Sequence, residues 1–236
     1  MYDSGIIIGS SGAIGSGLVT YLTEKNLIKQ LRTVSRQQET WSHACITHHV
    51  VSRYDDENAL ASIATESQYD LVLVATGLLH GHDIKPEKAL RDITVTAFNA
   101  VFHANSTTPA LIMKHFLPRL IPQKRAIFGA LSARVGSISD NNLGGWYAYR
   151  ASKSALNMIV KTASIEVARR HKHAIIVGLH PGTVDSRLSE PFKKNVKPNS
   201  LFSGAYAAQK LVSVINTLTP EQSGRCFAWD NSEVMP

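Results

Sequence analysis

The chain has 236 residues, of which 44% are hydrophobic and 18% are charged. This balance is typical of a folded globular protein and excludes the disordered and fibrous classes. No apolar run approaches the roughly 18 residues of a membrane-spanning helix, and two cysteines, Cys45 and Cys226, are too few for a disulfide framework. Since the first apolar run, residues 6–8, is also too short for a signal peptide, we expect a cytoplasmic protein with free thiols and no membrane contact.

The net charge is +7, and the basic residues are scattered along the chain. The densest pairs are Arg169-Arg170 and Lys193-Lys194. No recognisable nucleic-acid-reading motif accompanies them. The sequence therefore predicts a solvated basic surface without a nucleic-acid partner, and such a surface also suits a phosphorylated cofactor.

Short apolar runs rich in β-branched residues recur along the chain and predict strands. They lie at residues 5–8, 31–34, 46–51, 71–75, 126–131, 174–179 and 225–229. Stretches with helical spacing separate them, and this alternation favours parallel strands joined by right-handed crossovers. The predicted fold is α/β: one doubly wound Rossmann-type domain over residues 1–236, with about seven parallel strands and helices on both faces. Ligands bind such sheets at the carboxyl ends of the strands.

A glycine-rich turn follows the first predicted strand, and a helix is expected to begin near Ser16. Glycines let backbone N–H groups approach a pyrophosphate, and the helix presents its positive end to that anion. A tight turn without a ligand is the alternative, but the position on the first strand favours a dinucleotide site. The predicted contacts are Gly9, Ser11, Gly12, Ala13, Ile14 and Gly15.

The residue after the second strand bears on cofactor choice. An acid at this place would bind the ribose hydroxyls of NAD, but the sequence reads Thr33-Val34-Ser35-Arg36. An arginine cannot accept a hydrogen bond, whereas its planar fork suits a 2′-phosphate. The prediction is NADP(H), with an exposed arginine in a polar loop as the alternative.

Tyr149 and Lys153 are four residues apart in a strongly helical stretch. This spacing places both side chains on one helix face. A nearby ammonium favours the phenolate and makes Tyr149 a candidate general acid for a carbonyl. Such a pair occurs by chance on many helices, and it gains weight from the glycine turn upstream.

With these motifs the chain resembles the short-chain dehydrogenase/reductases over essentially its whole length. The segments Ser132-Ala133-Arg134-Val135-Gly136-Ser137-Ile138 and Gly144-Gly145-Trp146-Tyr147-Ala148-Tyr149-Arg150-Ala151-Ser152-Lys153 are most similar to the C-factor-like and sniffer-like carbonyl reductases. The resemblance implies that Tyr149 transfers the proton, that Lys153 also binds the nicotinamide ribose, and that Asn105 holds a water in a proton relay. Without the resemblance, Asn105 would be read as a helix interruption.

The serine that polarises the carbonyl in this family is displaced. The family has a Ser-Ser pair after the fifth strand, and this chain has Ser132-Ala133, so the usual catalytic position is an alanine. Ser132 or Ser137 is a candidate for the hydroxyl, and Ser132 is the residue that we predict.

Further motifs are altered but recognisable. The resemblance implies that Ala75, Thr76 and Gly77 lie beside the adenosine half of the cofactor, and that Ser52 replaces the aspartate after the third strand, with Asp55 nearby. After the sixth strand it implies nicotinamide contacts from Pro181, Gly182, Val184 and Ser186.

Three further features of the sequence bear on a binding site: a long loop, three aromatic residues and ten histidines. Residues 185–200, which include Pro191, Asn195 and Pro198, are expected to form a lid, although a plain surface loop is the alternative. Trp146, Tyr147 and Phe192 are candidate pocket walls. Neither His48-His49 nor His80-Gly81-His82 has metal-ligand spacing with carboxylates or thiols, so no metal is predicted.

The sequence thus predicts an NADP(H)-dependent oxidoreductase that transfers a hydride between nicotinamide and a small carbonyl or alcohol substrate. The alternative is a catalytically weak NADP-binding sensor or signalling protein with the same fold, since some C-factor relatives are linked to cell–cell signalling. A homodimer or homotetramer is expected, because the helix of Tyr149 commonly forms an interface in the family.

Overall fold

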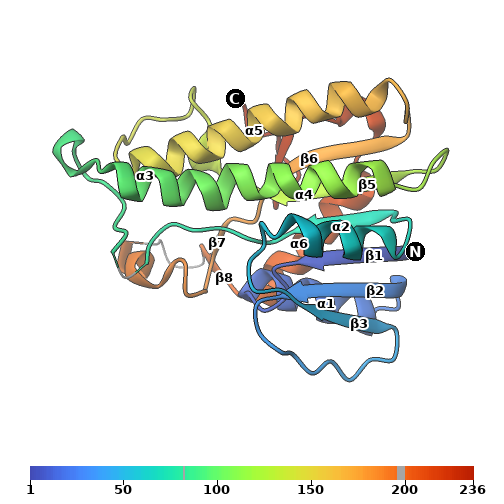
Figure 1. The fold of residues 1–236 in the computed structure, drawn as a ribbon. Helices are drawn as coiled ribbons and strands as arrows, with labels where there is room; N and C mark the ends of the chain where they lie inside the picture. The colour runs from blue at the N-terminus through green and yellow to red at the C-terminus, as the bar shows by residue number, and fades with distance from the viewer. Residues whose placement is uncertain (82, 196–199) are drawn as a thin grey trace.

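The computed structural model describes residues 1–81, 83–195 and 200–236. Its main sheet has seven strands in the order β3-β2-β1-β4-β5-β6-β9, and every neighbouring pair is parallel (Figure 1). The predicted doubly wound α/β fold is therefore confirmed. The strand order reverses between β1 and β4, which is the switch point where ligands bind in such sheets.

All seven predicted strands are present, with small differences at their ends. The strands are β1 (Tyr2–Ile8), β2 (Ile28–Ser35), β3 (Ile46–Val50), β4 (Leu71–Val74), β5 (Ala126–Leu131), β6 (Ala174–His180) and β9 (Cys226–Ala228). β1 begins three residues earlier than expected because Tyr2 and Ser4 pair with Ile28 and Gln30 of β2. The polar residues Asp3 and Ser4 had hidden this extension.

Helices cover both faces of the sheet. One buried cluster joins the sheet to α1 (Ala13–Glu24) and α6 (Gly204–Thr217). A second cluster joins the sheet to α2 (Glu57–Thr65), α4 (Thr108–Phe116) and α5 (Tyr147–Ala168). With α3 (Val95–Phe102), α4 and α5 run along one face in Figure 1. The first helix begins at Ala13 rather than near Ser16, because Gly12 already has the extended backbone of an N-cap.

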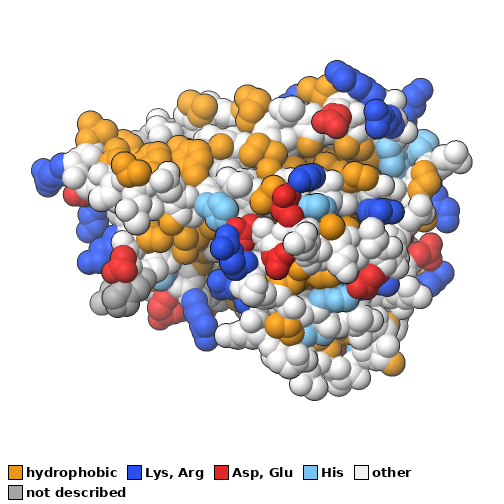
Figure 2. Space-filling model, viewed as in Figure 1, with side chains coloured by type: hydrophobic (Ala, Val, Ile, Leu, Met, Phe, Trp, Pro, Cys, Tyr) orange, Lys and Arg blue, Asp and Glu red, His pale blue; other side chains and the backbone are white. Residues whose placement is uncertain are grey.

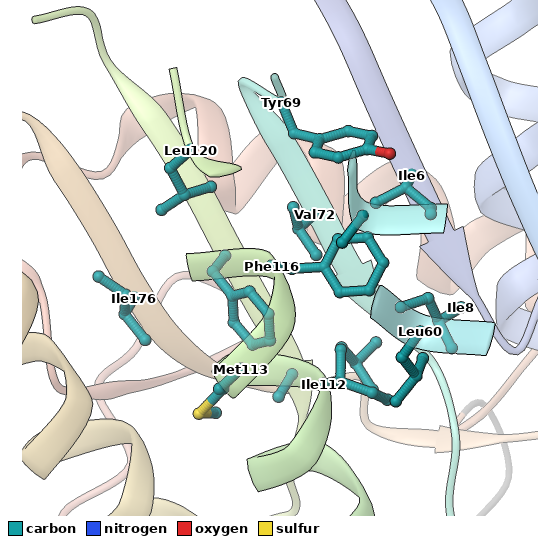
Figure 3. Packing of buried hydrophobic residues seen from close by; sticks show 14 of the residues in the cluster. Ile6, Ile8, Leu60, Tyr69, Val72, Ile112, Met113, Phe116, Leu120 and Ile176 are labelled. Carbon is teal, nitrogen blue, oxygen red and sulfur yellow. The ribbon is translucent and has the colours of Figure 1, made fainter. Parts of the chain in front are cut away.

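The larger cluster joins the sheet to α2, α4 and α5. Figure 3 shows Ile112, Met113 and Phe116 of α4 in the same buried cluster as Val72 and Ile176 of the sheet. Phe116 is fully buried, and its ring lies 5.6 Å from that of Tyr69. Burying such side chains stabilises the fold by roughly 1.5–3 kcal/mol each, which makes the sheet a rigid base for the loops at its carboxyl edge.

A π-helical turn, His103–Thr107, joins α3 to α4. Pro109 explains it, because proline has no N–H to bond the carbonyl of Asn105 four residues earlier and its ring crowds that carbonyl. Single π-turns of this kind often occur at functional sites. The helix interruption that was the alternative reading of Asn105 thus corresponds to a local widening within an almost continuous helical segment (Figure 1).

The segment expected to form a lid contains short ordered elements. β7 (Thr183–Val184) pairs in parallel with β8 (Leu201–Phe202), and a 3₁₀ helix, η5 (Glu190–Asn195), lies between them. Residues 196–199, which include Pro198, are outside the described part of the chain. Within the described residues, no helix is both long enough and apolar enough to cross a membrane.

Candidate active site

Four groups of predicted site residues follow four neighbouring strands at the carboxyl edge of the sheet. The glycine turn follows β1, Ala75–Gly77 follow β4, Ser132 follows β5, and Pro181 follows β6 by one position. These strands are adjacent in the sheet. The fold therefore gathers motifs that are as far apart in the sequence as Gly9 and Pro181.

The glycine turn is packed too closely for larger residues. A Cβ atom on Gly15 would lie 2.1 Å from the carbonyl oxygen of Gly9, which no side chain could tolerate. Gly12, the N-cap of α1, provides no capping side chain, and among the described residues of its first turn there is no acid. The positive end of α1 is thus presented to the turn, an arrangement that suits a pyrophosphate.

Arg36 and Ser11 meet at Tyr54, a residue that sequence reasoning missed. The guanidinium carbon of the exposed Arg36 lies 5.5 Å from the centroid of the Tyr54 ring. The Tyr54 hydroxyl lies beside the Ser11 and Arg36 side chains, and burial raises its pKa. An aromatic residue just after the third predicted strand was the available signal for this contact.

An acid also reaches the glycine turn, from farther along the chain than expected. The Ser10 hydroxyl donates to Glu39 Oε2 at 2.7 Å. Glu39 comes after Arg36 in the loop that follows β2, so inspection of the strand end alone did not reveal it. The carboxylate holds this loop against the turn.

Tyr149 and Lys153 lie one turn apart near the start of α5. The Lys153 Nζ atom is 5.8 Å from the centroid of the Tyr149 ring and donates to the carbonyl oxygen of Leu131 at 2.8 Å. The two residues are 9% and 3% exposed. Burial raises the pKa of Tyr149 to about 12 and lowers the pKa of Lys153 to about 8. Near neutral pH, Lys153 thus remains largely protonated close to the phenol.

Asn105 is fully buried beside this pair. Its Oδ1 accepts the N–H of Leu78 at 2.8 Å, and its Nδ2 donates to the Leu78 carbonyl at 2.7 Å and to Ser152 Oγ at 3.1 Å. A Cβ atom on Gly77 would be 3.5 Å from Asn105 Oδ1 and 3.8 Å from Lys153 Nζ. The structure therefore brings Gly77, Asn105 and Lys153 together.

The hydroxyls of the two candidate serines are hydrogen-bonded to residues other than the tyrosine. The Ser132 hydroxyl donates to Asn157 Oδ1 at 2.7 Å, while Ala133 belongs to the apolar cluster around Tyr149. Ser137 accepts the N–H of Asp140 at 3.1 Å and lies 3.3 Å from Ser139 Oγ. Alternation explains the difference, since successive side chains leaving a strand point to opposite sides.

The Ser132→Ala variant tests this geometry. We expect the free energy of unfolding to fall by about 1–2 kcal/mol, because Asn157 loses a buried hydrogen-bond donor. Turnover should change by less than about tenfold. Loss of a preorganised donor to the substrate carbonyl would lower turnover by more than that. Denaturant unfolding and steady-state kinetics measure the two effects. A carbonyl-orienting role for Ser132 would give the reverse pattern, with a large loss of turnover and little loss of stability.

The motif after β6 forms a turn closed by its own hydroxyls. Ser186 N–H donates to Ser189 Oγ at 3.2 Å, and the two hydroxyl oxygens are 3.4 Å apart. Pro181 is buried, Gly182 has a left-handed backbone, and Val184 is in β7. The predicted nicotinamide contacts thus lie on a defined backbone next to the site.

Aromatic residues cover the tyrosine. The Trp146 ring lies 6.2 Å from the Tyr149 ring and 4.9 Å from the Phe192 ring of η5, and His80 lies 5.9 Å from Phe192. His80 Nε2 is also 2.9 Å from the Arg187 carbonyl oxygen. Trp146 and Phe192, predicted as pocket walls, are brought together, whereas the part played by His80 was missed.

Charged groups elsewhere do not form a second centre in the described residues. No three His, Cys, Asp or Glu side chains there are arranged to hold a metal ion, and His82 is outside the described part. Both cysteines are free. On the face in Figure 2, basic and acidic side chains are interspersed around a band of apolar ones.

Comparison with known proteins defines the class. A short chain dehydrogenase family model matches residues 5–197, and the chain belongs to this family, as its motifs predicted. The C-signal of Myxococcus xanthus is 33% identical over 146 residues, which cover 62% of this chain and 82% of that protein.

Two solved structures share the fold along nearly the whole chain. The carbonyl reductase Sniffer of D. melanogaster has a TM-score of 0.84 at 22% identity and covers 99% of both chains. The NADPH-bound carbonyl reductase from chicken fatty liver has a TM-score of 0.84 at 20% identity and covers 99% of this chain and 94% of that one.

Proposed function

We propose that the protein is an NADP(H)-dependent carbonyl reductase. The observation that carries the proposal is the group formed by Tyr149, Lys153 and Asn105 at the carboxyl edge of the sheet, next to the glycine turn. The family match and the likeness to an NADPH-bound carbonyl reductase support it. The substrate is a small carbonyl compound or the corresponding alcohol.

The residues present fit a dinucleotide. The close contact of Gly15 with Gly9 leaves the N-terminus of α1 facing the turn, and Arg36 provides a fork for a 2′-phosphate beside Tyr54. Thr76 adds a further observation, because its Oγ1 is buried and has no hydrogen-bond partner among the described residues. Buried hydroxyls are normally paired, so a cofactor hydroxyl or amide at this loop would satisfy it.

When bound, the nicotinamide supplies or accepts the hydride. In the proposed reduction, the Tyr149 hydroxyl donates its proton to the oxygen of the substrate, and the Lys153 ammonium stabilises the phenolate that remains. Asn105 holds the Leu78 backbone beside Lys153, and its own carbonyl, which Pro109 cannot bond, is a place for the relay water. Trp146 and Phe192 exclude bulk water from the tyrosine.

We propose a homo-oligomer as the working form. Several large apolar side chains are exposed along α3 and α5, where Val95 is 77%, Met158 66% and Ile165 50% exposed. On the face in Figure 2, apolar side chains form a band over the helices that Figure 1 labels α3, α4 and α5. Exposed apolar patches of this kind are typical of protein interfaces.

The experiment that tests the function starts with cofactor binding. NADPH and NADH are titrated by fluorescence, and aldehydes, ketones and quinones are then screened for NADPH oxidation. Turnover of at least one carbonyl class supports the reductase. Tight NADPH binding without turnover of any carbonyl would contradict it and would favour the sensor, the alternative to which the likeness to C-signal also points.

Arg36→Asp tests the cofactor preference. We expect the affinity for NADPH to fall by about 10- to 100-fold, because the variant loses a charge-assisted pair with the 2′-phosphate and gains a like charge. The affinity for NADH should stay the same or rise. Fluorescence titration with both cofactors measures the ratio, and an unchanged ratio would remove Arg36 from the phosphate site.

A further inference from the structure

The turn before α5 has an unusual backbone. Gly144, Gly145 and Trp146 are consecutive left-handed residues, with φ of +64, +65 and 53°. Glycine adopts this conformation freely, but it is uncommon for a residue as large as tryptophan. Trp146 is also the N-cap of α5 and makes no side-chain capping hydrogen bond there. The first N–H groups of the helix therefore need an acceptor from elsewhere.

Glu87, from the loop between β4 and α3, supplies that acceptor. Its backbone oxygen accepts the N–H of Trp146 at 2.5 Å, and its Oε2 accepts the N–H of Ala148 at 3.2 Å. Ala148 is the second residue of α5, and its amide is one that an N-cap side chain normally binds. Glu87 thus caps the helix from a position 61 residues earlier in the chain.

Only one of the two side-chain oxygens of Glu87 has a hydrogen-bond partner among the described residues. The residue is 3% exposed, and its Oε1 is buried without a hydrogen-bond partner among the described residues. The helix dipole and the bond to Ala148 offset part of the cost of burying this charge. A residue selected for stability alone would be paired at both oxygens or be apolar.

The two contacts of Glu87 hold Trp146 and Ala148, which come just before the proposed catalytic residue Tyr149. Tyr149 directly follows Ala148, and the Trp146 ring covers Tyr149 at 6.2 Å. Arg150 holds the same turn, because its Nε donates to the carbonyls of Gly144 and Gly145 at 3.2 and 3.0 Å. If this first turn frayed, Tyr149 would move relative to Lys153, which lies one turn deeper in α5.

We propose that Glu87 is a positioning residue, which caps α5 in place of Trp146 and thereby holds Tyr149 and Trp146 for catalysis. This inference rests on the proposed role of Tyr149 as proton donor. Glu87 acts through the helix and does not itself touch the reacting atoms.

The test compares Glu87→Met, which fills the same volume without an acceptor, with Glu87→Gln, whose amide oxygen can accept the Ala148 N–H. For carbonyl reduction with NADPH, we expect kcat of the Met variant to fall by about 10- to 100-fold, since small misplacements of catalytic groups have effects of this size. The KM for NADPH should change by less than twofold, and the Gln variant should recover most of kcat. Asp56→Ala, which removes the side-chain cap of α2 at Ala59, is the matched control.

Hydrogen exchange of the α5 amides provides a readout that does not depend on activity. The first turn, residues 147–150, should exchange faster in Glu87→Met than in wild type, Glu87→Gln or Asp56→Ala. If the wild type reduces no carbonyl, the proposed function fails, and exchange still tests the cap. If the Met variant does not fold, Glu87→Asp, which retracts the carboxylate, is judged by the same criteria. Unchanged exchange, or an equal loss of kcat in Asp56→Ala, would overturn the proposal.

Discussion

Tyr149→Phe should lower the turnover of carbonyl substrates by about 10³-fold, within the range that a positioned proton donor contributes. The phenol is 9% exposed beside Lys153, so solvent has little access to replace its proton. The affinity for NADPH should be almost unchanged, because only the hydroxyl is removed. Steady-state kinetics and fluorescence titration measure the two quantities.

Tyr69→Phe is the matched control for that experiment. Tyr69 is also buried, its pKa is also raised to about 12 by burial, and its hydroxyl donates to the Ile63 carbonyl at 2.9 Å. Its loss should reduce stability by about 1 kcal/mol and leave turnover intact. Equal turnover in wild type and Tyr149→Phe, with both enzymes active, would show that another group donates the proton.

In the proposed reaction, Tyr149 depends on the charge of Lys153. Burial alone raises the pKa of the phenol to about 12 and makes the phenolate costly. A lysine that is neutral would not offset this cost, whereas a protonated one would. Because burial lowers the pKa of Lys153 to about 8, its charge is present below that pH and is lost above it. The ammonium charge of Lys153, which activates Tyr149 in the proposed reaction, is therefore present near neutral pH.

The fold was predictable from the sequence because local patterns agreed with the global arrangement. β5 was predicted at its observed bounds, since residues 126–131 form an unbroken apolar run. The glycine turn and the Tyr149–Lys153 pair are each formed by residues close together in the sequence. Their local geometry could therefore be predicted from the spacing of those residues. A helix interruption at Asn105 was only the alternative to its predicted relay role, and the π-helical turn His103–Thr107 is explained by Pro109, whose effect on the residue four positions earlier was not part of the prediction.

Other parts of the site depend on contacts between distant segments, which no local pattern encodes. Ser132 illustrates this, because its hydroxyl bonds Asn157 on α5. The next residue, Ala133, has its side chain on the opposite side of the chain and packs in the cluster around Tyr149. Glu87 lies in a loop without regular structure, and its cap on α5 joins residues 61 positions apart. Tyr54 likewise reaches Arg36 from the turn that follows β3. Tertiary packing, rather than propensity, sets each of these contacts.

Lys153→Met should abolish most activity and yet stabilise the protein without cofactor. Turnover should fall by about 100-fold or more, because the phenolate of Tyr149 loses its neighbouring charge. The lowering of the Lys153 pKa from 10.5 to about 8 corresponds to a penalty of about 3 kcal/mol for burying its charge. Met removes this penalty but also the bond from Nζ to Leu131 O, so we expect a net gain of about 1–2 kcal/mol.

The stability difference between Lys153→Met and wild type should depend on pH, and the lowered pKa of Lys153 sets the direction of this dependence. Below pH 8, the folded and the unfolded protein both carry the Lys153 proton, and the burial penalty is fully present. Between about pH 8 and 10.5, the unfolded chain keeps the proton that the folded protein has lost, so the wild type gains stability as the pH rises. The advantage of Lys153→Met should therefore be largest at pH 7 and shrink toward pH 10, as measured by denaturant unfolding. An advantage that grew with pH would contradict a destabilising buried ammonium. A destabilising buried ammonium is expected where function, rather than stability, determines the residue, as in the role proposed for Lys153.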